Sequence, residues 1–389
     1  MGFSPCTSAR HAPALLLFLL FLLLGPALFA QLSPTLTIDQ EVAAFAFATD
    51  GRIAYAERRV FNQGKLVVQR DDVWIAARDG KKTRIIHGEK MFRGPAPFSY
   101  SIHSLRWSLD ATRLAIEMFT SVMTDLRGET KDAFVIWLLD PAGKEIKIGN
   151  GPGMIEDGYN AAWLPDGVTL VYLHEAVSPK LLYSIRTLRP LSARGDTLFD
   201  NHVFASVAWD LRPGAPGAAV AIERDASLTG PIRLVWLDLQ KQQRRELAAL
   251  ESYSGQLSVS PTGKQAAYFL DQETLEIREI ARPENFVRLR VAYGNYVWAP
   301  DERRILLKRG LFDAAARGSS ARRSGSLVWV TVPTLEPQPA AKSAQPAPEA
   351  ELQPALSGLL FQGFAISPDG RSLAVTAPGA RPLQLYPIQ

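Results

Sequence analysis

Short runs of apolar residues, each bounded by a tight cluster of polar residues, follow one another along most of this 389-residue chain. The runs span about four to eight residues, which is the length of a strand rather than of a helix. Gly, Pro, Asp and Ser, the residues that favour turns, fill the clusters between them. The pattern therefore predicts many short β-strands joined by tight turns.

One phrase returns seven times: an apolar strand, a polar turn and a second apolar strand. The clearest copy runs from Ala365 to Val375 around Ser367-Pro368-Asp369-Gly370. In such a turn Pro presets φ, Ser and Asp side chains bind nearby backbone N–H groups, and Gly accepts a left-handed conformation. The other copies turn at Thr49-Asp50-Gly51, Ser108-Leu109-Asp110, Pro165-Asp166-Gly167, Arg212-Pro213-Gly214, Pro261-Thr262-Gly263 and Pro300-Asp301. This repetition predicts a repeat architecture.

The first five copies each divide into four short strands, as the first one does at Val42–Ala48, Arg52–Glu57, Asp72–Ala77 and Thr83–Ile86, and the sixth has three assigned strands. Four antiparallel strands joined by turns make one blade of a β-propeller. The sequence therefore predicts an all-β fold, a β-propeller of seven four-stranded blades. Six blades are the alternative, if the irregular fourth copy is an insertion. In the second copy we expect the fourth strand at Lys144–Ile148.

The seventh copy offers only three strands, at Gly363–Ile366, Ser372–Thr376 and Leu383–Ile388. A spare strand, Thr35–Asp39, precedes the first copy. A ring of blades leaves open sheet edges where its ends meet, unless the two ends share a blade. We therefore expect residues 35–40 to form the outer strand of the last blade.

Four copies place a tryptophan shortly before the turn, at Trp107, Trp163, Trp209 and Trp298. An indole ring is large enough to fill the gap between neighbouring blades, so this position predicts core packing. A row of stacking platforms for sugars or bases is the alternative.

The turn phrase, with its preceding Trp and its following apolar strand, resembles the WD40-like PD40 repeat of TolB-type propellers in bacterial periplasms. The resemblance covers residues 35–389 and is closest at Ser367–Gly370, whereas Arg212–Gly217 distorts the fourth copy. It implies the propeller fold. TolB itself carries an α/β domain ahead of its propeller, which we do not expect here, so a role in the Tol system carries over poorly.

Residues 1–30 follow the order of a secretory signal peptide. Arg10 and His11 precede an apolar run from Ala14 to Leu24, which Gly25-Pro26 ends. Small residues then lead to Ala30, where we expect cleavage. The protein is therefore expected to be periplasmic or secreted. An uncleaved helix that anchors it in the inner membrane is the alternative.

Residues 31–389 are expected to form a single propeller domain without disulfides, because the only cysteine is Cys6. Residues 310–325 and 335–356 are low in complexity and cannot bury an apolar face, so we expect mobile surface insertions there. The connection 87–101 is the preferred functional loop, because it carries four large apolar side chains on a stretch expected at the surface: Met91, Phe92, Phe98 and Tyr100.

Charge gives little indication of a partner. The formal net charge is +4, and loss of residues 1–30 removes one arginine and no acid, which leaves +3. Such a small excess does not favour nucleic acid or another polyanion. Solvated strand edges and loops account for the basic pairs Arg58-Arg59, Lys81-Lys82, Arg244-Arg245 and Arg322-Arg323.

No catalytic, cofactor-binding or metal-binding residues are assigned. The histidines beyond the signal form no HExxH or i,i+4 pair: His87, His103, His174 and His202. PD40-type blades also precede α/β-hydrolase peptidase domains, but the required Gly-x-Ser-x-Gly is missing, and Glu251–Gly255 is the nearest stretch. The acidic pairs Asp71-Asp72 and Glu156-Asp157 lack calcium-loop spacing and are interpreted as surface turns.

We therefore expect a non-catalytic, monomeric module that binds a protein or peptide, or acts as a scaffold, in the bacterial envelope. A propeller enzyme of lactonase or lyase type, with a metal in the central channel, is the alternative. The residues expected on the innermost strands include no carboxylate and no histidine, which counts against the enzyme: Ala43-Ala44-Phe45, Ser104-Leu105, Asn160-Ala161, Ser206-Val207, Gln256-Leu257, Tyr296-Val297 and Phe364-Ala365. Neither nucleic acid nor, after cleavage, a membrane is expected as partner.

Overall fold

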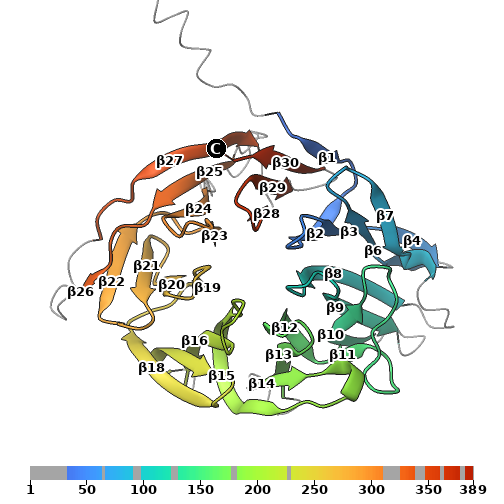
Figure 1. The fold of residues 1–389 in the computed structure, drawn as a ribbon, viewed down its shortest axis with the longest axis horizontal. Coiled ribbons are helices and arrows are strands. Elements are labelled where there is room, and N and C mark those ends of the chain that lie inside the picture. The colour runs from blue at the N-terminus through green and yellow to red at the C-terminus, as the bar shows by residue number, and fades with distance from the viewer. Residues whose placement is uncertain are drawn as a thin grey trace, which may run out of the picture.

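The chain winds once around a central opening as a series of antiparallel sheets, whose inner strands lie near the centre (Figure 1). The computed structural model describes residues 33–63, 66–90, 98–123, 130–176, 182–225, 229–309, 325–337, 347–359, 363–376 and 382–388. The expected signal peptide lies outside this part of the chain. The all-β prediction is confirmed, since the only helices among the described residues are the short 3-10 turns Gly88–Lys90 and Pro190–Ser192.

The first two sheets have four strands each, in sequence order from the centre outward. They comprise β2 (Val42–Phe47), β3 (Ile53–Glu57), β6 (Asp72–Ala76) and β7 (Lys82–Ile86), then β8 (Phe98–Trp107), β9 (Leu114–Met123), β10 (Thr130–Leu139) and β11 (Met154–Glu156). A separate hairpin in the β3–β6 connection, which the sequence analysis did not predict, comprises β4 (Val60–Gln63) and β5 (Leu66–Gln69).

The third sheet has seven strands, because one long strand belongs to two four-stranded units. Its members are β12 (Gly158–Trp163), β13 (Leu170–Glu175), β14 (Tyr183–Leu188), β15 (Thr197–Asp210), β16 (Ala218–Arg224), β17 (Ile232–Asp238) and β18 (Gln243–Leu250). The start of β15 pairs with β14 and the rest pairs with β16. The number of blades stays a prediction, since this seven-stranded sheet can be counted as one blade or as two.

The remaining sheets complete the circuit. They comprise β19 (Gly255–Val259), β20 (Gln265–Phe269), β21 (Thr274–Glu279), β22 (Asn285–Arg290) and β26 (Glu336–Pro337), then β23 (Tyr296–Trp298), β24 (Arg304–Arg309), β25 (Gly325–Thr331) and β27 (Leu352–Leu359), and last β28 (Gly363–Ile366), β29 (Ser372–Thr376), β30 (Leu383–Pro387) and β1 (Leu36–Ile38). The N-terminal strand β1 pairs with β30, with Thr37 opposite Gln384, as the sequence predicts for residues 35–40.

Burial explains why the middle strands read as apolar runs. Every residue of β3 is buried, and so are six of the seven residues of β16, whereas only one of the five residues of the outer strand β7 and two of the eight of β18 are buried. Middle strands are covered on both faces by neighbouring sheets, but an outer strand meets water. The core accordingly divides into clusters between successive sheets. One of them joins Ile38 and Leu383 of the last sheet to Tyr55 of the first.

Two predicted segments need correction. The fourth strand of the second copy is β11, not residues 144–148, which form only isolated bridges. Residues 335–356 are not simply a surface insertion: β26 pairs with β22, Pro348 O accepts a hydrogen bond from Arg290 N, and Leu352 begins β27. Leu335, Ala350 and Leu352 pack on a buried cluster, so the few apolar residues of this Pro/Ala-rich stretch suffice to hold its ends.

The preferred functional loop also needs correction. Residues 91–97, with Met91 and Phe92, lie outside the described part of the chain. Phe98 and Tyr100, which we expected at the surface, are buried, and the Tyr100 hydroxyl donates to Asp71 O at 2.7 Å. They belong to the core because β8 begins at Phe98, earlier than the sequence pattern indicates. Of the other predicted insertion, 310–325, only Gly325 is described, at the start of β25.

Candidate binding site

The turn face is the end of the strands that carries the β2–β3 and β6–β7 turns and their equivalents in the other sheets. On this face the turn aspartates accept hydrogen bonds from backbone N–H groups two residues further on. Asp50 binds Arg52 N and Asp369 binds Arg371 N, both at 3.1 Å, and Asp301 binds Arg303 N at 3.0 Å. These bonds close the turns locally, as expected for Asp in this position. The turn face is therefore built of rigid polar loops.

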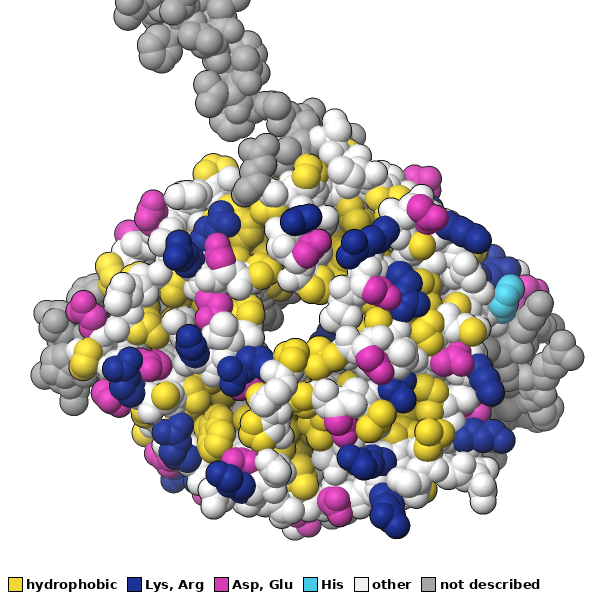
Figure 2. Space-filling model, in the orientation of Figure 1, with side chains coloured by type: hydrophobic (Ala, Val, Ile, Leu, Met, Phe, Trp, Pro, Cys, Tyr) yellow, Lys and Arg dark blue, Asp and Glu magenta, His cyan; other side chains and the backbone are white. Residues whose placement is uncertain are grey.

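Neighbouring turns are also tied to each other. Arg52 donates to Ala111 O and Arg113 donates to Gly167 O, each at 2.7 Å, from one sheet to the next. Thr262 binds Glu302 in the same manner through its backbone N–H and its hydroxyl. Lys and Arg side chains are interspersed with Asp and Glu on the face shown in Figure 2, around the central opening. No field of a single sign covers this face.

The four tryptophans link successive inner strands, as the packing interpretation predicts. Each indole N–H donates to the inner strand of the preceding sheet or unit: Trp107 to Ala46 O, Trp163 to Arg106 O, Trp209 to Asn160 O and Trp298 to Ser258 Oγ, at 2.8–3.3 Å. Trp163 and Trp298 are buried. A buried ring cannot stack with a free ligand, so the alternative of a row of platforms does not hold for these two.

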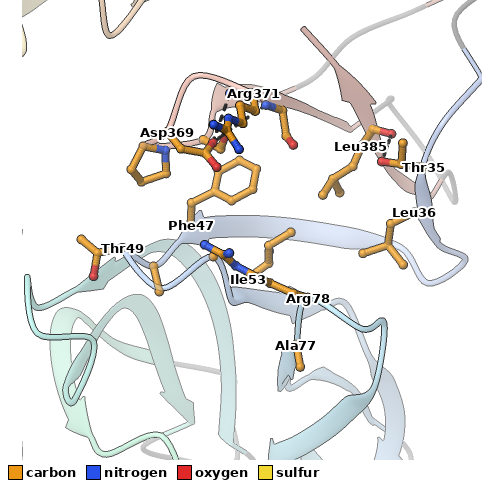
Figure 3. Close-up of a pocket in the computed structure, with 15 residues that line it drawn as sticks. Thr35, Leu36, Phe47, Thr49, Ile53, Ala77, Arg78, Asp369, Arg371 and Leu385 are labelled. Carbon is orange, nitrogen blue, oxygen red and sulfur yellow. Dashed lines mark hydrogen bonds between the residues drawn. The ribbon is translucent and has the colours of Figure 1, made fainter.

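The seam is the junction between the first sheet and the last, and it contains a pocket of about 330 Å³ on the turn face (Figure 3). Its apolar lining comes from both sides, with Phe47 and Ile53 from the first sheet and Leu36 and Leu385 from the last. Thr35 ties the N-terminal segment to the last sheet, since its backbone N–H donates to Leu385 O at 2.7 Å. The pocket therefore exists only where the two ends of the chain meet.

Three charged side chains line this pocket: Arg78, Arg371 and Asp369 (Figure 3). The Ser367 hydroxyl donates to Asp369 at 2.6 Å and, with the Arg371 N–H and the charges of Arg371 and Arg78, holds the pKa of Asp369 below its usual value. Asp369 is thus ionised at neutral pH. The charged lining carries two positive charges and one negative charge.

Gly51 gives Arg78 its place. A Cβ added to Gly51 would lie only 2.0 Å from Arg78 Nε, and the φ of Gly51 is +85°. Only glycine combines this left-handed turn with so close an approach. The side chain of Arg78 therefore lies directly over the β2–β3 turn, beside the pocket.

Two further pockets open on the turn face, each between neighbouring four-stranded units. One, of about 540 Å³, lies between the β12–β13 turn at Asp166 and the β17–β18 turn at Gln240. The other, of about 300 Å³, lies between Arg212 and Lys264 and has Trp236 in its wall. All three pockets described therefore lie between units on one face.

The acidic pairs behave differently from each other. Glu156, the last residue of β11, and Asp157, which follows it, are exposed, as predicted. Asp71 and Asp72 are not a surface turn but are buried: Asp71 accepts from Ile102 N at 2.8 Å, and Asp72 accepts from Gly88 N at 2.7 Å. Burial raises the pKa of Asp71 in spite of these hydrogen bonds. The pair anchors the connection between the first two sheets. No local sequence pattern indicates this role.

The innermost strands do hold a histidine, contrary to the sequence analysis. His103 lies at a bulge of β8 and is exposed, as is Arg106 on the same strand. The nearby Glu117 of β9 accepts a hydrogen bond from Ala161 N at 2.6 Å, and burial raises its pKa against the opposing charges of Arg106 and His103. Among the described residues, no three His, Cys, Asp or Glu side chains are grouped so that they could hold a metal.

The remaining histidines lie apart from the seam. His202 is 2.5 Å from Glu223, which also binds Arg244, while burial lowers the pKa of His174. Sequence reasoning assigned no role to Arg78 and Arg371. Both stand next to Asp-Gly turns, but their meeting depends on the closure of the seam. No helix in the described part of the chain is long and apolar enough to cross a membrane.

No protein-family model matches the chain, and no curated protein matches it. Among solved structures, the β-propeller domain of Cps50 (Swd1) from Myceliophteria thermophila aligns with 91% of this chain and 100% of its own length, at 9% identity and a TM-score of 0.54. A chain of a mitotic checkpoint complex aligns with 92% of this chain and 95% of its own length, at 12% identity and a TM-score of 0.39. The first similarity shows a β-propeller fold, and the fold alone.

Proposed function

We propose that this β-propeller is a non-catalytic module that binds a protein or peptide through its turn face. One observation carries the proposal: the three described pockets all open on that face, between neighbouring units. The turns around them are fixed by their own hydrogen bonds and by contacts from sheet to sheet. A surface ordered before binding loses little conformational entropy when it takes up a ligand.

The proposal includes export to the bacterial envelope, because residues 1–30 have the order of a cleavable signal peptide. The protein would act there as a periplasmic or secreted scaffold. N-terminal sequencing of the protein isolated from its natural source tests this part, and a start near Gln31 is the expected result.

Single-cysteine labelling tests the binding face, since residues 31–389 contain no cysteine. Asp79→Cys, Lys241→Cys and Lys264→Cys each place an exposed thiol on the turn face, one near each pocket. Val67→Cys, at a position that is 70% exposed in the β4–β5 hairpin, is the matched control at the other end of the strands.

Each variant is coupled to a bulky polyethylene glycol maleimide and is then tested for retention of phage-displayed peptides selected on the unlabelled protein. We expect at least one turn-face label to abolish retention, and the Val67→Cys label to leave it intact. Retention blocked only from the hairpin, or the absence of any selectable peptide, would contradict the proposal.

A further inference from the structure

We propose that the seam pocket binds a carboxylate group of a peptide that carries an apolar side chain beside it. This inference rests on the proposed function and names the chemistry of one subsite. Its two supports are the exposed guanidinium groups and the less exposed apolar residues that line the same pocket.

The arginines of the seam differ from those at the other turns. Elsewhere on the turn face an arginine is paired with a turn aspartate, at 2.6–3.5 Å: Arg52 with Asp50, Arg113 with Asp110, Arg189 with Asp166, Arg212 with Asp210 and Arg304 with Asp301. The guanidinium groups of Arg78 and Arg371 form no ion pair or hydrogen bond with any residue that the structure describes. Both are exposed at the same pocket.

Asp369 is occupied within its own turn. Its Oδ1 accepts from the Ser367 hydroxyl and from Arg371 N. The charged lining of the pocket therefore retains an excess of one positive charge. An anionic group of the ligand would balance this excess, and an amide would not.

The two arginines come from different sheets, Arg78 from the β6–β7 turn and Arg371 from the β28–β29 turn (Figure 3). A guanidinium group presents a planar array of N–H donors that matches the two oxygens of a carboxylate. Gly51 lets Arg78 lie beside the pocket, because a side chain at position 51 would occupy the space that the Arg78 guanidinium group now fills.

The apolar lining of the pocket selects for more than charge. Ile53 is 3% exposed, and Phe47, Leu36 and Leu385 complete an apolar surface beside it. A pocket of about 330 Å³ is at the small end of the range for ligand sites. It matches one acidic group and one neighbouring apolar side chain. A bare anion would leave the apolar lining unused.

A small probe tests the subsite without any peptide. The probe is 3-phenylpropionate, and its amide is the matched neutral analogue; binding to the protein from residue 31 onward is followed by NMR chemical-shift titration. Because charge-assisted hydrogen bonds are lost, we expect the amide to bind at least about tenfold more weakly. Arg78→Gln and Arg371→Gln should each weaken binding of 3-phenylpropionate by about the same factor.

Lys241→Gln is the matched control, because it removes one exposed positive charge from the turn face outside the seam pocket. It should leave the affinity of the probe unchanged. Thermal melts check that each variant is folded. If the arginine variants fail to fold, the comparison of acid with amide on the unmodified protein still decides the point.

Peptides then separate this inference from the proposed function. Selected peptides are made with internal Asp or Glu changed to Asn or Gln, and separately with an amidated C-terminus, to identify which carboxylate binds. Peptides that bind regardless of both changes and of Arg78→Gln leave the proposed function standing and overturn the carboxylate subsite. If binding of the probe depends on Arg78 but no peptide can be selected, the carboxylate subsite stands and the proposed function is overturned. Inorganic phosphate that binds the seam pocket more tightly than 3-phenylpropionate would also overturn the subsite.

Discussion

At the scale of single residues, the turn face owes its shape to side chains that satisfy the backbone of their own turn. Ser108 and Asp110 bind each other and the turn backbone, and Ser367 and Asp369 do the same in the last sheet. Local bonds of this kind need no distant partner, which is why the turns can be predicted from the sequence. The role of Arg78 cannot be predicted in this way, because its neighbours come from both ends of the chain.

Gly51 allows a test of how Arg78 is seated. Gly51→Ala should destabilise the protein, since its φ of +85° costs an L-residue about 1–2 kcal/mol and the new Cβ would collide with Arg78 Nε. Gly214→Ala is the matched control, because Gly214 has a φ of +77° and nothing within 4 Å of an added Cβ.

Urea denaturation measures both free energies of unfolding. We expect Gly51→Ala to cost more than Gly214→Ala, and to weaken binding of 3-phenylpropionate, which Gly214→Ala should not do. Equal losses of stability with unchanged binding would show that Arg78 does not depend on Gly51.

At the scale of elements, alternation and turn chemistry predict most strands well. β3 and β29 lie within a residue or two of their predicted ranges, because middle strands are uniformly apolar and end at Asp, Gly or Pro. The misses share another cause. β11, β26 and β27 are outer strands whose pairing is set by an existing edge rather than by their own pattern. The burial of Asp71 and Asp72 was not predicted, because the sequence does not distinguish a hydrogen-bonded carboxylate in the core from one at the surface.

The N-terminal strand offers the next prediction. Removal of residues 31–40 deletes β1, uncovers the edge of β30 and removes Ile38, which is fully buried. Loss of such a side chain costs about 2–5 kcal/mol, so the melting temperature should fall by roughly 5 °C or more.

Removal of residues 31–34 alone is the control, because it leaves Thr35 and β1 in place. Thermal unfolding followed by circular dichroism compares the two deletions with the chain that begins at residue 31. A melting temperature that the longer deletion leaves unchanged would contradict the contribution of β1 to the last sheet.

At the scale of the whole molecule, the two ends of the chain build the seam together. β1 supplies the outer strand of the last sheet, and the cluster around Ile38 and Tyr55 joins that sheet to the first. The same junction carries the seam pocket. Stability and the proposed binding site therefore depend on one closure, and anything that loosens the ends should affect both.

A cysteine pair tests this closure directly. Thr37 and Gln384 lie opposite each other in the β1–β30 pair, and directly opposite residues have Cβ atoms about 4.5–5.5 Å apart, close to disulfide reach. Thr37→Cys with Gln384→Cys, in the chain from residue 31 onward, should oxidise to one disulfide and lose both free thiols in a thiol titration. The bond would close nearly the whole chain into a loop, so oxidation should raise stability by up to about 4 kcal/mol over the reduced form. It should also tighten binding of 3-phenylpropionate, because Thr35 and Leu36 beside it line the pocket.

Each single cysteine variant controls for the substitutions themselves. Two thiols that stay free under oxidising conditions would show that the ends do not pair in this register, and the pocket built on their junction would fall with it.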